Sequence, residues 1–478
     1  MSDLGRHGRN LSWMLIAEVI QKVLALALFA YATRQLSLIE NGWYGAYLAL
    51  FSLLVTTING GFYDVAVRDI AQRRDRVHGL ISSSLLMQTA ISGLVTLAVW
   101  LGAWLLRYPV RFQVILVVGT ISALLWAHIR MQYAVIAAHE KFKYISLLNI
   151  LLRTAIVTAS LALLYVGYGA LALVAVLIPI SVAQIVLSYG CVQKVCGGYR
   201  FLPSVRDMKY LLRQGFPIAI GGIAATGYYS LDIPLLTSLS NPETAGYYAN
   251  AMRFLLLCLT LSDLLASVTY PILSRKAAGP EDAQCFALTR CLKASVMAAL
   301  PLAMGGTVLC AGIVKTLCGE RYLPSAPAVA VLMWVLACEM INNTLVVYLR
   351  AKSLQRLPAA VYVTGLAAKV VLSLFVIPRY GMDGFLQLNL VVSVAMTGTL
   401  LVLSLRVLPS LRVGQLASGV FLRPLAAAII MGLSLWYVRH LSIILTIPIG
   451  AAVYGAALLA LGGLDEFDRR MFKGTIGG

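Results

Sequence analysis

Charged side chains inside apolar stretches are the residues of this chain that could do chemistry. Five bases lie in such stretches: Lys22, Arg130, Arg153, Arg253 and Lys369. An ionised side chain at the centre of a bilayer costs about 2.5–3.5 kcal/mol on insertion scales, so such groups normally face a cavity or a charged partner. Cations distributed through the depth of a membrane would attract an anion such as a diphosphate. We therefore predict that these five bases line a cationic binding cavity.

Each of these bases also has a plainer interpretation. Lys22 lies one helical turn after Glu18, so the two side chains could neutralise each other. Arg130 and Arg153 could extend toward the cytoplasmic headgroups, because a long basic side chain keeps its charge in water while its stem stays in lipid. Lys369 lies near the predicted midplane, so for this residue we favour the cavity role.

Four acidic residues in apolar stretches are candidates for coupling and gating: Asp232, Glu18, Asp263 and Glu339. A carboxylate inside a membrane could bind H+ or Na+, or it could only neutralise a neighbouring base. Arg253, for example, could pair with Asp232 or Asp263, or it could extend toward the outer surface. Both roles, ion binding and neutralisation of a neighbouring base, stay open for these four carboxylates at this point.

Asp232 ranks first among these acids because of the stretch around it, which is rich in Gly and Pro. Pro removes a helix hydrogen bond and Gly weakens a helix, so this stretch should be kinked or discontinuous. Such a kink could also serve packing alone. The residues of the predicted hinge are Pro217, Gly221, Gly222, Gly227 and Pro234.

The amino-acid composition indicates the class of protein to which these charged residues belong. The chain has 478 residues, of which 60% are hydrophobic and 12% charged, and its mean hydropathy is +0.85. A soluble domain is about 45–50% apolar and about 25% charged. This composition excludes an ordinary soluble enzyme and predicts an all-α polytopic membrane protein.

Apolar runs long enough to cross a bilayer recur throughout the chain, and we count fourteen. Their predicted bounds are 11–35, 42–67, 78–106, 113–138, 145–166, 170–193, 214–238, 247–273, 291–316, 327–350, 357–377, 383–407, 424–439 and 442–463. They divide the chain into four parts. These are an N-terminal six-helix bundle (1–195), a cytoplasmic linker (196–213), a C-terminal six-helix bundle (214–407), and two additional helices with a tail (408–478).

The two predicted bundles look like repeats. The sequence GWYGAY at 42–47 corresponds to GYYANA at 246–251, and the Tyr-Gly pair at 168–169 corresponds to the pair at 380–381. Because each bundle has six spans, both begin on the same side of the membrane. The repeats should then be parallel and related by an axis along the membrane normal.

The distribution of positive charge predicts the orientation. The chain has a net charge of +19, and 26 of its 38 Lys and Arg fall in one set of alternating connections, against seven in the other set. Connections rich in Lys and Arg stay in the cytoplasm. The sequence therefore predicts that both termini are cytoplasmic, and it explains the net charge without nucleic acid.

No catalytic constellation accompanies these features. The sequence has no GxxxxGK[ST] phosphate loop, no HExxH and no Asp-rich metal motif, and its eight Cys form no CxxC. The connections between spans are too short for an extramembrane enzymatic domain. These features, with the internal repeat, favour a transporter that uses no metal or organic cofactor and is driven by an H+ or Na+ gradient or by consumption of its product.

Three motifs resemble those of a known family. The sequence DIPLL at 232–236, followed by GYYANAMR at 246–253, resembles the seventh–eighth helix signature of polysaccharide flippases, which is an Asp, an apolar run and vGxYxxAxR. Lys369, followed by IPRYGMDG at 377–384, resembles the eleventh-helix pattern K…P.yG..G, and the opening at 10–68 is similar to the family's first two helices. The chain thus resembles O-antigen (Wzx-type) flippases of the multidrug/oligosaccharidyl-lipid/polysaccharide exporter (MOP) superfamily.

This resemblance implies two six-helix bundles around a central V-shaped, cationic cavity. It also implies a function, the movement of a polyprenyl-diphosphate-linked oligosaccharide from the inner to the outer leaflet of the bacterial cytoplasmic (inner) membrane by alternating access. Asp232 and Arg253 stand at the family's Asp and Arg positions. The implied partners are the lipid-linked glycan, the bilayer, and a polysaccharide polymerase and glycosyltransferases, but no nucleic acid.

Three other functions stay open at this point. Lipid II flippases, which move a peptidoglycan precursor, also have fourteen spans. A cation-coupled small-molecule exporter is a second alternative, although a ladder of Arg and Lys would repel cationic drugs. The third is a membrane-embedded enzyme that acts on glycans.

Overall fold

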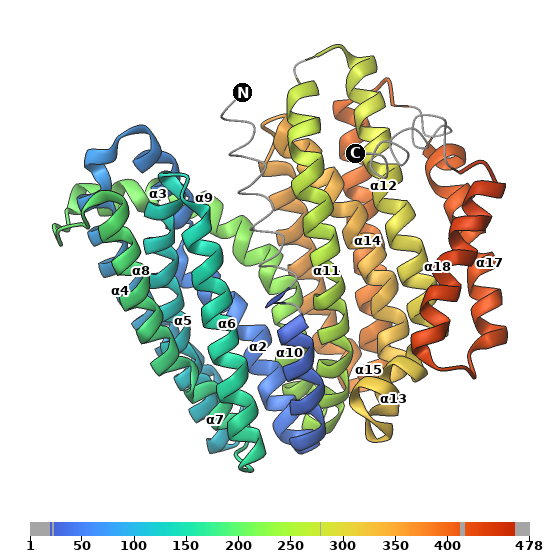
Figure 1. The fold of residues 1–478 in the computed structure, drawn as a ribbon, viewed down its shortest axis with the longest axis horizontal. Helices are drawn as coiled ribbons and strands as arrows, with labels where there is room; N and C mark the ends of the chain where they lie inside the picture. The colour runs from blue at the N-terminus through green and yellow to red at the C-terminus, as the bar shows by residue number, and fades with distance from the viewer. Residues whose placement is uncertain (1–19, 22, 278, 412–415, 464–478) are drawn as a thin grey trace. The chain divides into compact units, whose positions relative to one another are not determined.

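A computed structural model of the chain describes residues 20–21, 23–277, 279–411 and 416–463 (Figure 1). The described residues form helices joined by short connections and contain no strand. The predicted all-α membrane fold is therefore confirmed. The chain divides into two compact units, unit 1 at Met1–Ala249 and unit 2 at Asn250–Gly478.

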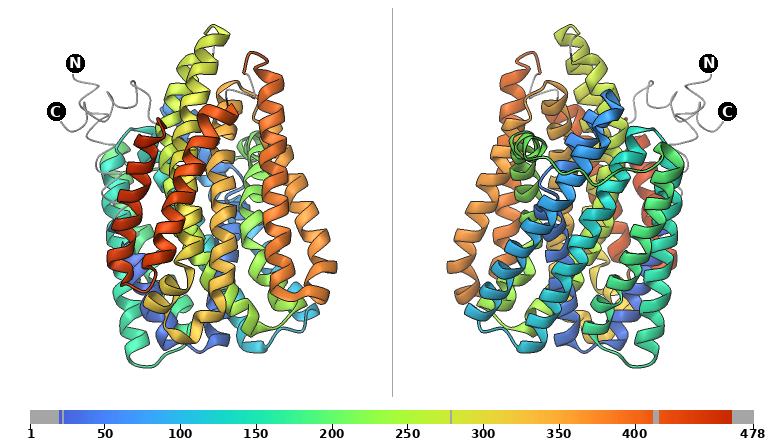
Figure 2. Two further views of the ribbon diagram at one scale, coloured as in Figure 1. Left: turned by 90° about the vertical axis from the view of Figure 1, so that its right-hand side faces the viewer. Right: turned by 90° about the vertical axis from the view of Figure 1, so that its left-hand side faces the viewer.

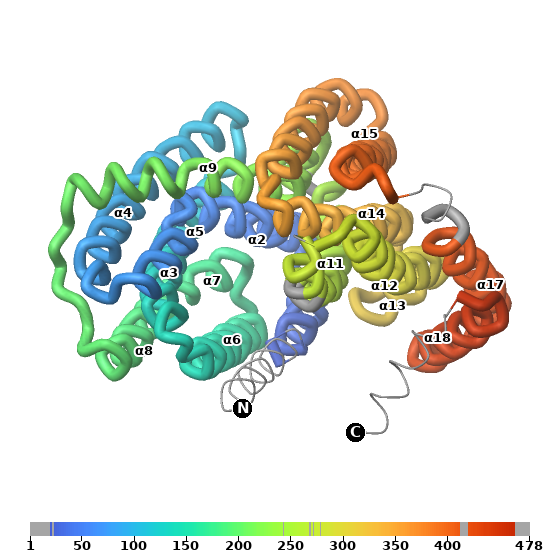
Figure 3. Tube along the Cα trace, turned by 90° about the horizontal axis from the view of Figure 1, so that it is seen from above, coloured from blue at the N-terminus to red at the C-terminus, as the bar shows by residue number. Residues whose placement is uncertain are grey.

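Unit 1 is built around α5 (Val110–Ala138). This helix packs against α2, α3, α4, α7 and α8 (Figure 3). More than half of its residues are buried. The other helices of unit 1 are α2 (Leu38–Asn59), α3 (Phe62–Gln72), α4 (Val77–Leu105), α6 (Phe142–Tyr165), α7 (Ala170–Ala175), α8 (Leu177–Cys196), α9 (Val205–Ser230) and α10 (Asp232–Leu239), with a short 3-10 turn η1 (Arg74–Arg76) and the first residues of α11 (Pro242–Lys276).

Unit 2 is built around α14 (Ala326–Ala351), which packs between α12 (Glu281–Val308) and α15 (Arg356–Val407). Most of the residues of α14 are buried. Two C-terminal helices, α17 (Arg423–Val438) and α18 (Ile443–Ala460), lie side by side and pack on α12 (Figure 2). The remaining elements are the rest of α11, α13 (Cys310–Cys318), a 3-10 helix η2 (Glu320–Ser325) and a π-helical turn η3 (Leu416–Leu422).

Eleven helices of the described residues are long and apolar enough to cross a membrane. Three features explain the difference from the fourteen predicted spans. The first predicted span is described only from residue 20, and its helix Val23–Gln35 is shorter than the eleven. The single helix α15 contains two predicted spans, which join at Gly381, where φ is 60° and ψ is −143°. The predicted span 214–238 corresponds to α9 and α10, which are not among the eleven.

The outer faces of these helices match a lipid environment. On α4, Leu94, Leu97, Leu101, Trp104 and Leu105 are all exposed, and Leu94 and Leu105 are each 70% exposed. Their spacing of three and four residues places them on one face of the helix. A continuous apolar face of this size is not stable in water, so it indicates contact with acyl chains.

The predicted span 42–67 is two helices in the structure, because α2 ends at Asn59 and α3 begins at Phe62. Gly60 and Gly61 join them with φ values of 55° and 73°, a conformation that L side chains rarely adopt. α9 crosses this turn at Gly215, where a Cβ atom would lie 2.5 Å from the Gly60 carbonyl oxygen. Glycines therefore permit contact between the two backbones at this crossing.

Two segments that the sequence pairs as repeats meet at their glycines. A Cβ atom on Gly246, at the start of α11, would lie 2.8 Å from the Leu38 carbonyl oxygen and 3.7 Å from the Gly42 nitrogen. Gly42 and Gly246 are the first residues of the corresponding motifs. The starts of α2 and α11 are thus in close contact, which a larger side chain at 246 would prevent.

Candidate functional site

Asp232 lies at the start of α10 with only 1% of its surface exposed. The Tyr248 hydroxyl donates a hydrogen bond of 2.6 Å to Asp232 Oδ2. A buried carboxylate is costly unless donors compensate it, and bonds to a charged group are the stronger kind. Tyr248 belongs to the GYYANA motif, so this motif supplies a partner for the acid.

The chain around Asp232 is broken into two helices. α9 ends at Ser230 and α10 begins at Asp232, with Leu231 between them. Pro234 has no N–H to donate to the carbonyl of Ser230, so one helix hydrogen bond is missing at this point. Pro217, Gly221, Gly222 and Gly227 all lie within α9, and Pro234 lies within α10. Their role as a hinge stays a prediction.

Glu339 is the second buried acid, and it lies in unit 2 on α14 with 4% of its surface exposed. The Tyr362 hydroxyl donates to Glu339 Oε2 over 2.9 Å, and Asn342 Nδ2 donates to Oε1 over 3.3 Å. Asp232 and Glu339 therefore share one local arrangement, a buried carboxylate that accepts a tyrosine hydroxyl. Asp263 differs, since it is exposed on α11 and accepts a 3.4 Å bond from Asn343 Nδ2.

The predicted bases differ in burial. Lys369 on α15 is 1% exposed, and its Nζ lies 5.8 Å from the centre of the buried Phe385 ring. Arg130 on α5 is half-buried, with its guanidinium carbon 4.9 Å from the centre of the Tyr63 ring. Arg153 on α6 and Arg253 on α11 are also half-buried. Aromatic faces stabilise cations in such sites.

The predicted site residues belong to both units. Arg130, Arg153 and Asp232 lie in unit 1, and Arg253, Asp263, Glu339 and Lys369 lie in unit 2. Glu18 and Lys22 lie outside the described residues. That all the bases line one cavity therefore stays a prediction.

A charged network on the predicted cytoplasmic side of unit 1 was not anticipated from the sequence. Arg76 Nη1 lies 3.1 Å from Asp69 Oδ2, and its Nη2 lies 3.1 Å from Asp207 Oδ1, so this side chain joins α3, η1 and α9. Arg68 Nε donates to Asp69 Oδ1 over 2.9 Å, which raises the pKa of Arg68. The Tyr210 hydroxyl accepts from Arg68 Nη2.

From the sequence, Arg76 is only one of the 26 Lys and Arg in the connections predicted to be cytoplasmic, and Asp207 lies more than a hundred residues away along the chain. No local spacing rule connects two residues so far apart. The same holds for Glu339 and Tyr362, which belong to different helices. A signal does exist for Tyr248, which follows Asp232 within the motif that carries the family resemblance.

The model of the family described as "Polysaccharide biosynthesis protein" matches residues 7–276. The chain belongs to this family. The matched region contains Arg130, Arg153, Asp232, Arg253 and Asp263, whereas Glu339 and Lys369 lie beyond it. A search for similar sequences among curated proteins finds no match.

Solved structures with the same fold extend over nearly the whole chain. The lipid II flippase MurJ, in an inward closed conformation, matches with a TM-score of 0.75 at 15% identity and covers 96% of this chain and 99% of its own. An inward-facing multidrug resistance MATE family transporter of the MOP superfamily matches with a TM-score of 0.68 at 12% identity, covering 82% and 96%.

A MOP superfamily transporter from Pyrococcus furiosus also matches, with a TM-score of 0.57, 14% identity, and coverage of 82% of this chain and 94% of its own. At such identities these similarities concern the fold alone. The chain therefore has the MOP superfamily fold that the sequence resemblance implies, and it is a multi-pass membrane protein.

Proposed function

We propose that this protein is a flippase that moves a polyprenyl-diphosphate-linked oligosaccharide, an O-antigen or other surface polysaccharide unit, from the inner to the outer leaflet of a bacterial cytoplasmic membrane. The observation that carries the proposal is Lys369, a lysine 1% exposed within a helix of membrane-spanning length. Such a charge is retained at a cost of several kcal/mol, so it indicates a polar function inside the membrane. Membership of the polysaccharide biosynthesis family supports a glycan-linked substrate.

In this proposal the diphosphate binds the bases one after another as it crosses the membrane. Arg130 and Arg153 receive it from the cytoplasmic leaflet, and Lys369, with Lys22, holds it near the midplane, while Arg253 lies nearer the outer side. Arg and Lys suit this role because each donates several charge-assisted hydrogen bonds to phosphate oxygens. The glycan crosses in water while the polyprenyl chain stays in lipid.

Bending at the break between α9 and α10 would expose the site alternately to the two sides. The predicted hinge residues Pro217, Gly221, Gly222, Gly227 and Pro234 surround this break. A helix interrupted at a proline costs less to bend than a continuous one. Both termini are cytoplasmic in this proposal, and the two six-helix repeats move as halves.

The buried acids are candidates for coupling to H+ or Na+. Asp232 and Glu339 each accept a tyrosine hydroxyl, which fixes the carboxylate while leaving it able to bind a cation. Glu18 and Asp263 stay candidates on sequence grounds alone. A polysaccharide polymerase and glycosyltransferases would work on the same lipid-linked glycan on either side of the membrane.

One observation favours a second candidate, a lipid II-type flippase. The structure of MurJ covers 96% of this chain, against 82% for the MATE transporter, so the likeness to MurJ extends over more of the chain. Both candidates move a polyprenyl diphosphate, so the same cationic residues serve either one. The two candidates differ in the glycan that is attached to the diphosphate, so a comparison of the two substrates distinguishes them.

The test is a flipping assay in proteoliposomes that contain a fluorescent polyprenyl-diphosphate-linked N-acetylglucosamine, with lipid II as a second probe. We expect Lys369→Gln to reduce flipping about tenfold, since a hydrogen bond to a charged group contributes about 1.5–3 kcal/mol. Lys369→Arg should keep more activity than Lys369→Gln. Lys315→Gln, at a side chain 60% exposed, is the matched control and should flip normally.

Undiminished flipping by a correctly inserted Lys369→Glu variant would refute the role of Lys369. Preference for lipid II over the first probe would favour the second candidate. Release or joining of sugars by the purified protein alone would instead make it a membrane-embedded enzyme.

A further inference from the structure

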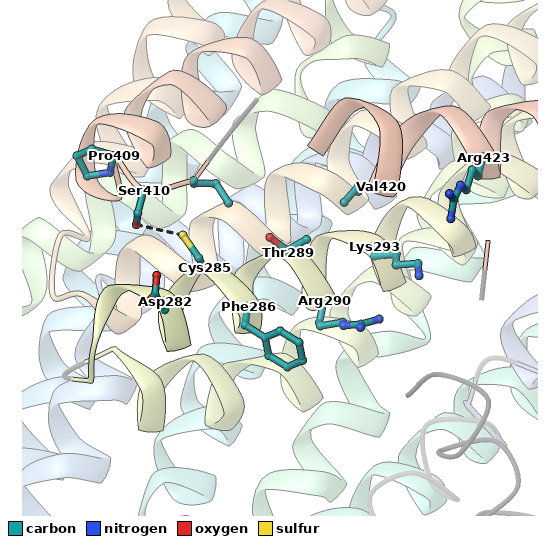
Figure 4. Close-up of a pocket in the computed structure, with 12 residues that line it drawn as sticks. Asp282, Cys285, Phe286, Thr289, Arg290, Lys293, Pro409, Ser410, Val420 and Arg423 are labelled. Carbon is teal, nitrogen blue, oxygen red and sulfur yellow. Dashed lines mark hydrogen bonds between the residues drawn. The ribbon is translucent and has the colours of Figure 1, made fainter. Parts of the chain in front are cut away.

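One pocket of unit 2 contains three basic side chains, and all three already have partners within the protein. The pocket has a volume of about 800 Å³ and lies between α12, the segment that follows α15, and the start of α17 (Figure 4). Arg423 Nη1 donates a 2.7 Å hydrogen bond to the carbonyl of Gly462, and Arg290 and Lys293 also interact with groups of the chain. A base whose N–H groups have no acceptor in the protein is better evidence of an anionic ligand.

Unit 1 contains two arginines that each lie over a tyrosine ring at almost the same distance. The guanidinium carbon of Arg76 is 4.8 Å from the centre of the Tyr210 ring, and that of Arg130 is 4.9 Å from the centre of the Tyr63 ring. The face of an aromatic ring attracts a cation and keeps it over the ring. The two pairs differ in what the N–H groups of the arginine bind.

Arg76 uses its N–H groups within the protein. Its Nη1 donates to Asp69 Oδ2 and its Nη2 donates to Asp207 Oδ1, each over 3.1 Å. Among the residues that the structure describes, no carboxylate and no other hydrogen-bond acceptor binds the guanidinium of Arg130, whose contact is with the Tyr63 ring. A guanidinium has five N–H donors in a planar fork that fits a phosphate. The donors of Arg130 are therefore left for a ligand.

The position of Tyr63 is set by the first turn of α3. The helix begins at Phe62, directly after the turn at Gly60–Gly61, so the face on which Tyr63 lies is determined by α3 and not by α2. Phe62 and Ile129 of α5 are 1% and 0% exposed and belong to one core cluster, against which Tyr63 packs. This core holds α3 against α5 and brings the Tyr63 ring to Arg130.

A tyrosine holds a cation in a way that suits a site for an anion. A carboxylate beside Arg130 would fix the guanidinium but would also cancel its charge. A neutral ring fixes the guanidinium and leaves the charge in place. A side chain whose position is already fixed also loses less entropy when it binds a ligand.

We propose that Tyr63 is a positioning residue for substrate binding: its ring holds the Arg130 guanidinium so that the N–H groups meet a phosphate of the transported diphosphate. The inference rests on the proposed function, in which Arg130 receives the diphosphate from the cytoplasmic leaflet. Both residues lie in the predicted cytoplasmic halves of their spans, 42–67 and 113–138. Tyr63 itself need not touch the substrate.

The test is the binding of a polyprenyl diphosphate without sugars to the full-length protein in detergent, followed by native mass spectrometry. Tyr63→Leu removes the ring and should weaken binding about fivefold, the effect of one cation–π contact. Tyr63→Phe keeps the ring and should bind within about twofold of wild type. Tyr210→Leu is the matched control, because it removes a ring at the same distance from an arginine that carboxylates already hold, and it should bind as wild type.

A double-mutant cycle separates positioning from support of the fold. In a chain that carries Arg130→Gln, we expect Tyr63→Leu to cause no further loss of binding, because the ring then has no cation to hold. Loss by the same factor with and without Arg130 would show that Tyr63 only supports the fold, and would overturn the proposal.

A second replacement keeps the shape of the ring, so it guards against misfolding of Tyr63→Leu. Trifluorinated phenylalanine in place of Tyr63 has nearly the same size as phenylalanine but lacks the negative face that attracts a cation. It should weaken binding as Tyr63→Leu does, while its melting temperature matches that of Tyr63→Phe. Binding equal to that of Tyr63→Phe would contradict the role of the ring.

The flipping assay distinguishes failure of this inference from failure of the proposed function. If wild type neither binds nor flips the polyprenyl diphosphate, the proposed function is wrong and the role of Tyr63 falls with it. If wild type flips it and Arg130→Gln weakens binding, but Tyr63→Leu does not, the proposed function stands and the role of Tyr63 is wrong.

Discussion

At the scale of single residues, two carboxylates of the predicted site are buried in an apolar interior. Asp232 and Glu339 are 1% and 4% exposed, and each accepts a hydrogen bond from a tyrosine hydroxyl. Removing such a donor leaves a buried charge with one bond fewer, which costs more than the bond itself contributes. The two tyrosines therefore matter for stability as well as for any ion binding.

Tyr248→Phe tests this directly, and the neighbouring Tyr247 provides a matched control. The Tyr248 hydroxyl donates to buried Asp232 over 2.6 Å, whereas the Tyr247 hydroxyl donates to exposed Glu243 over 3.4 Å. We expect Tyr248→Phe to destabilise the protein by about 1.5–3 kcal/mol and Tyr247→Phe by less than about 0.5 kcal/mol. Thermal unfolding of both purified variants in one detergent compares them. Equal melting temperatures would show that the bond to Asp232 contributes nothing.

At the scale of elements, the crossing of α9 over the turn between α2 and α3 connects two features that the sequence presents separately. Gly60 and Gly61 end one helix and start the next, and Gly215 lets the α9 backbone contact this turn. Gly215 lies two residues before Pro217, so the rigid contact and the predicted hinge are neighbours on the same helix. The contact at Gly215 would then hold the first part of α9 in place, and α9 would bend only at the residues that follow it.

Gly215→Ala should disturb this crossing. Its Cβ atom would lie 2.5 Å from the Gly60 carbonyl oxygen, a backbone atom that cannot rotate away, so we expect destabilisation of about 1–3 kcal/mol. Gly93→Ala on α4 is the control, since its Cβ atom would meet nothing within 4 Å and Ala favours a helix more than Gly. Thermal unfolding in detergent should show a lower melting temperature for the first variant only. A similar change in both would contradict the close contact.

Hydropathy located most helices well, because a span in lipid needs a long apolar run. The predicted span 113–138 corresponds to α5 at Val110–Ala138, and the predicted 327–350 to α14 at Ala326–Ala351. The break at Gly60–Gly61 was missed because two glycines do not interrupt an apolar run. The pairing of Arg76 with Asp207 was missed because contacts between distant helices leave no local pattern.

At the scale of the whole molecule, two properties follow from how apolar and basic residues are arranged along the sequence, and both apply to every helix. The apolar length of the helices makes the chain a multi-pass membrane protein, and the uneven distribution of Lys and Arg predicts its orientation. Neither property depends on which substrate is moved. Orientation decides which leaflet Arg130 and Arg153 face, so it decides the direction of the proposed transport.

Single-cysteine labelling in whole cells tests that orientation. In a variant whose eight native Cys are replaced by Ser or Ala, Arg73→Cys lies in a connection predicted to be cytoplasmic, and Arg439→Cys in the predicted external connection between α17 and α18. We expect a membrane-impermeant maleimide to label Arg439→Cys in intact cells and Arg73→Cys only after permeabilisation, because Lys-rich and Arg-rich connections are retained in the cytoplasm. Each cysteine serves as the control for the other. Labelling in the reverse order would place Arg130 and Arg153 nearer the outer leaflet, and the diphosphate would then have to enter from that side.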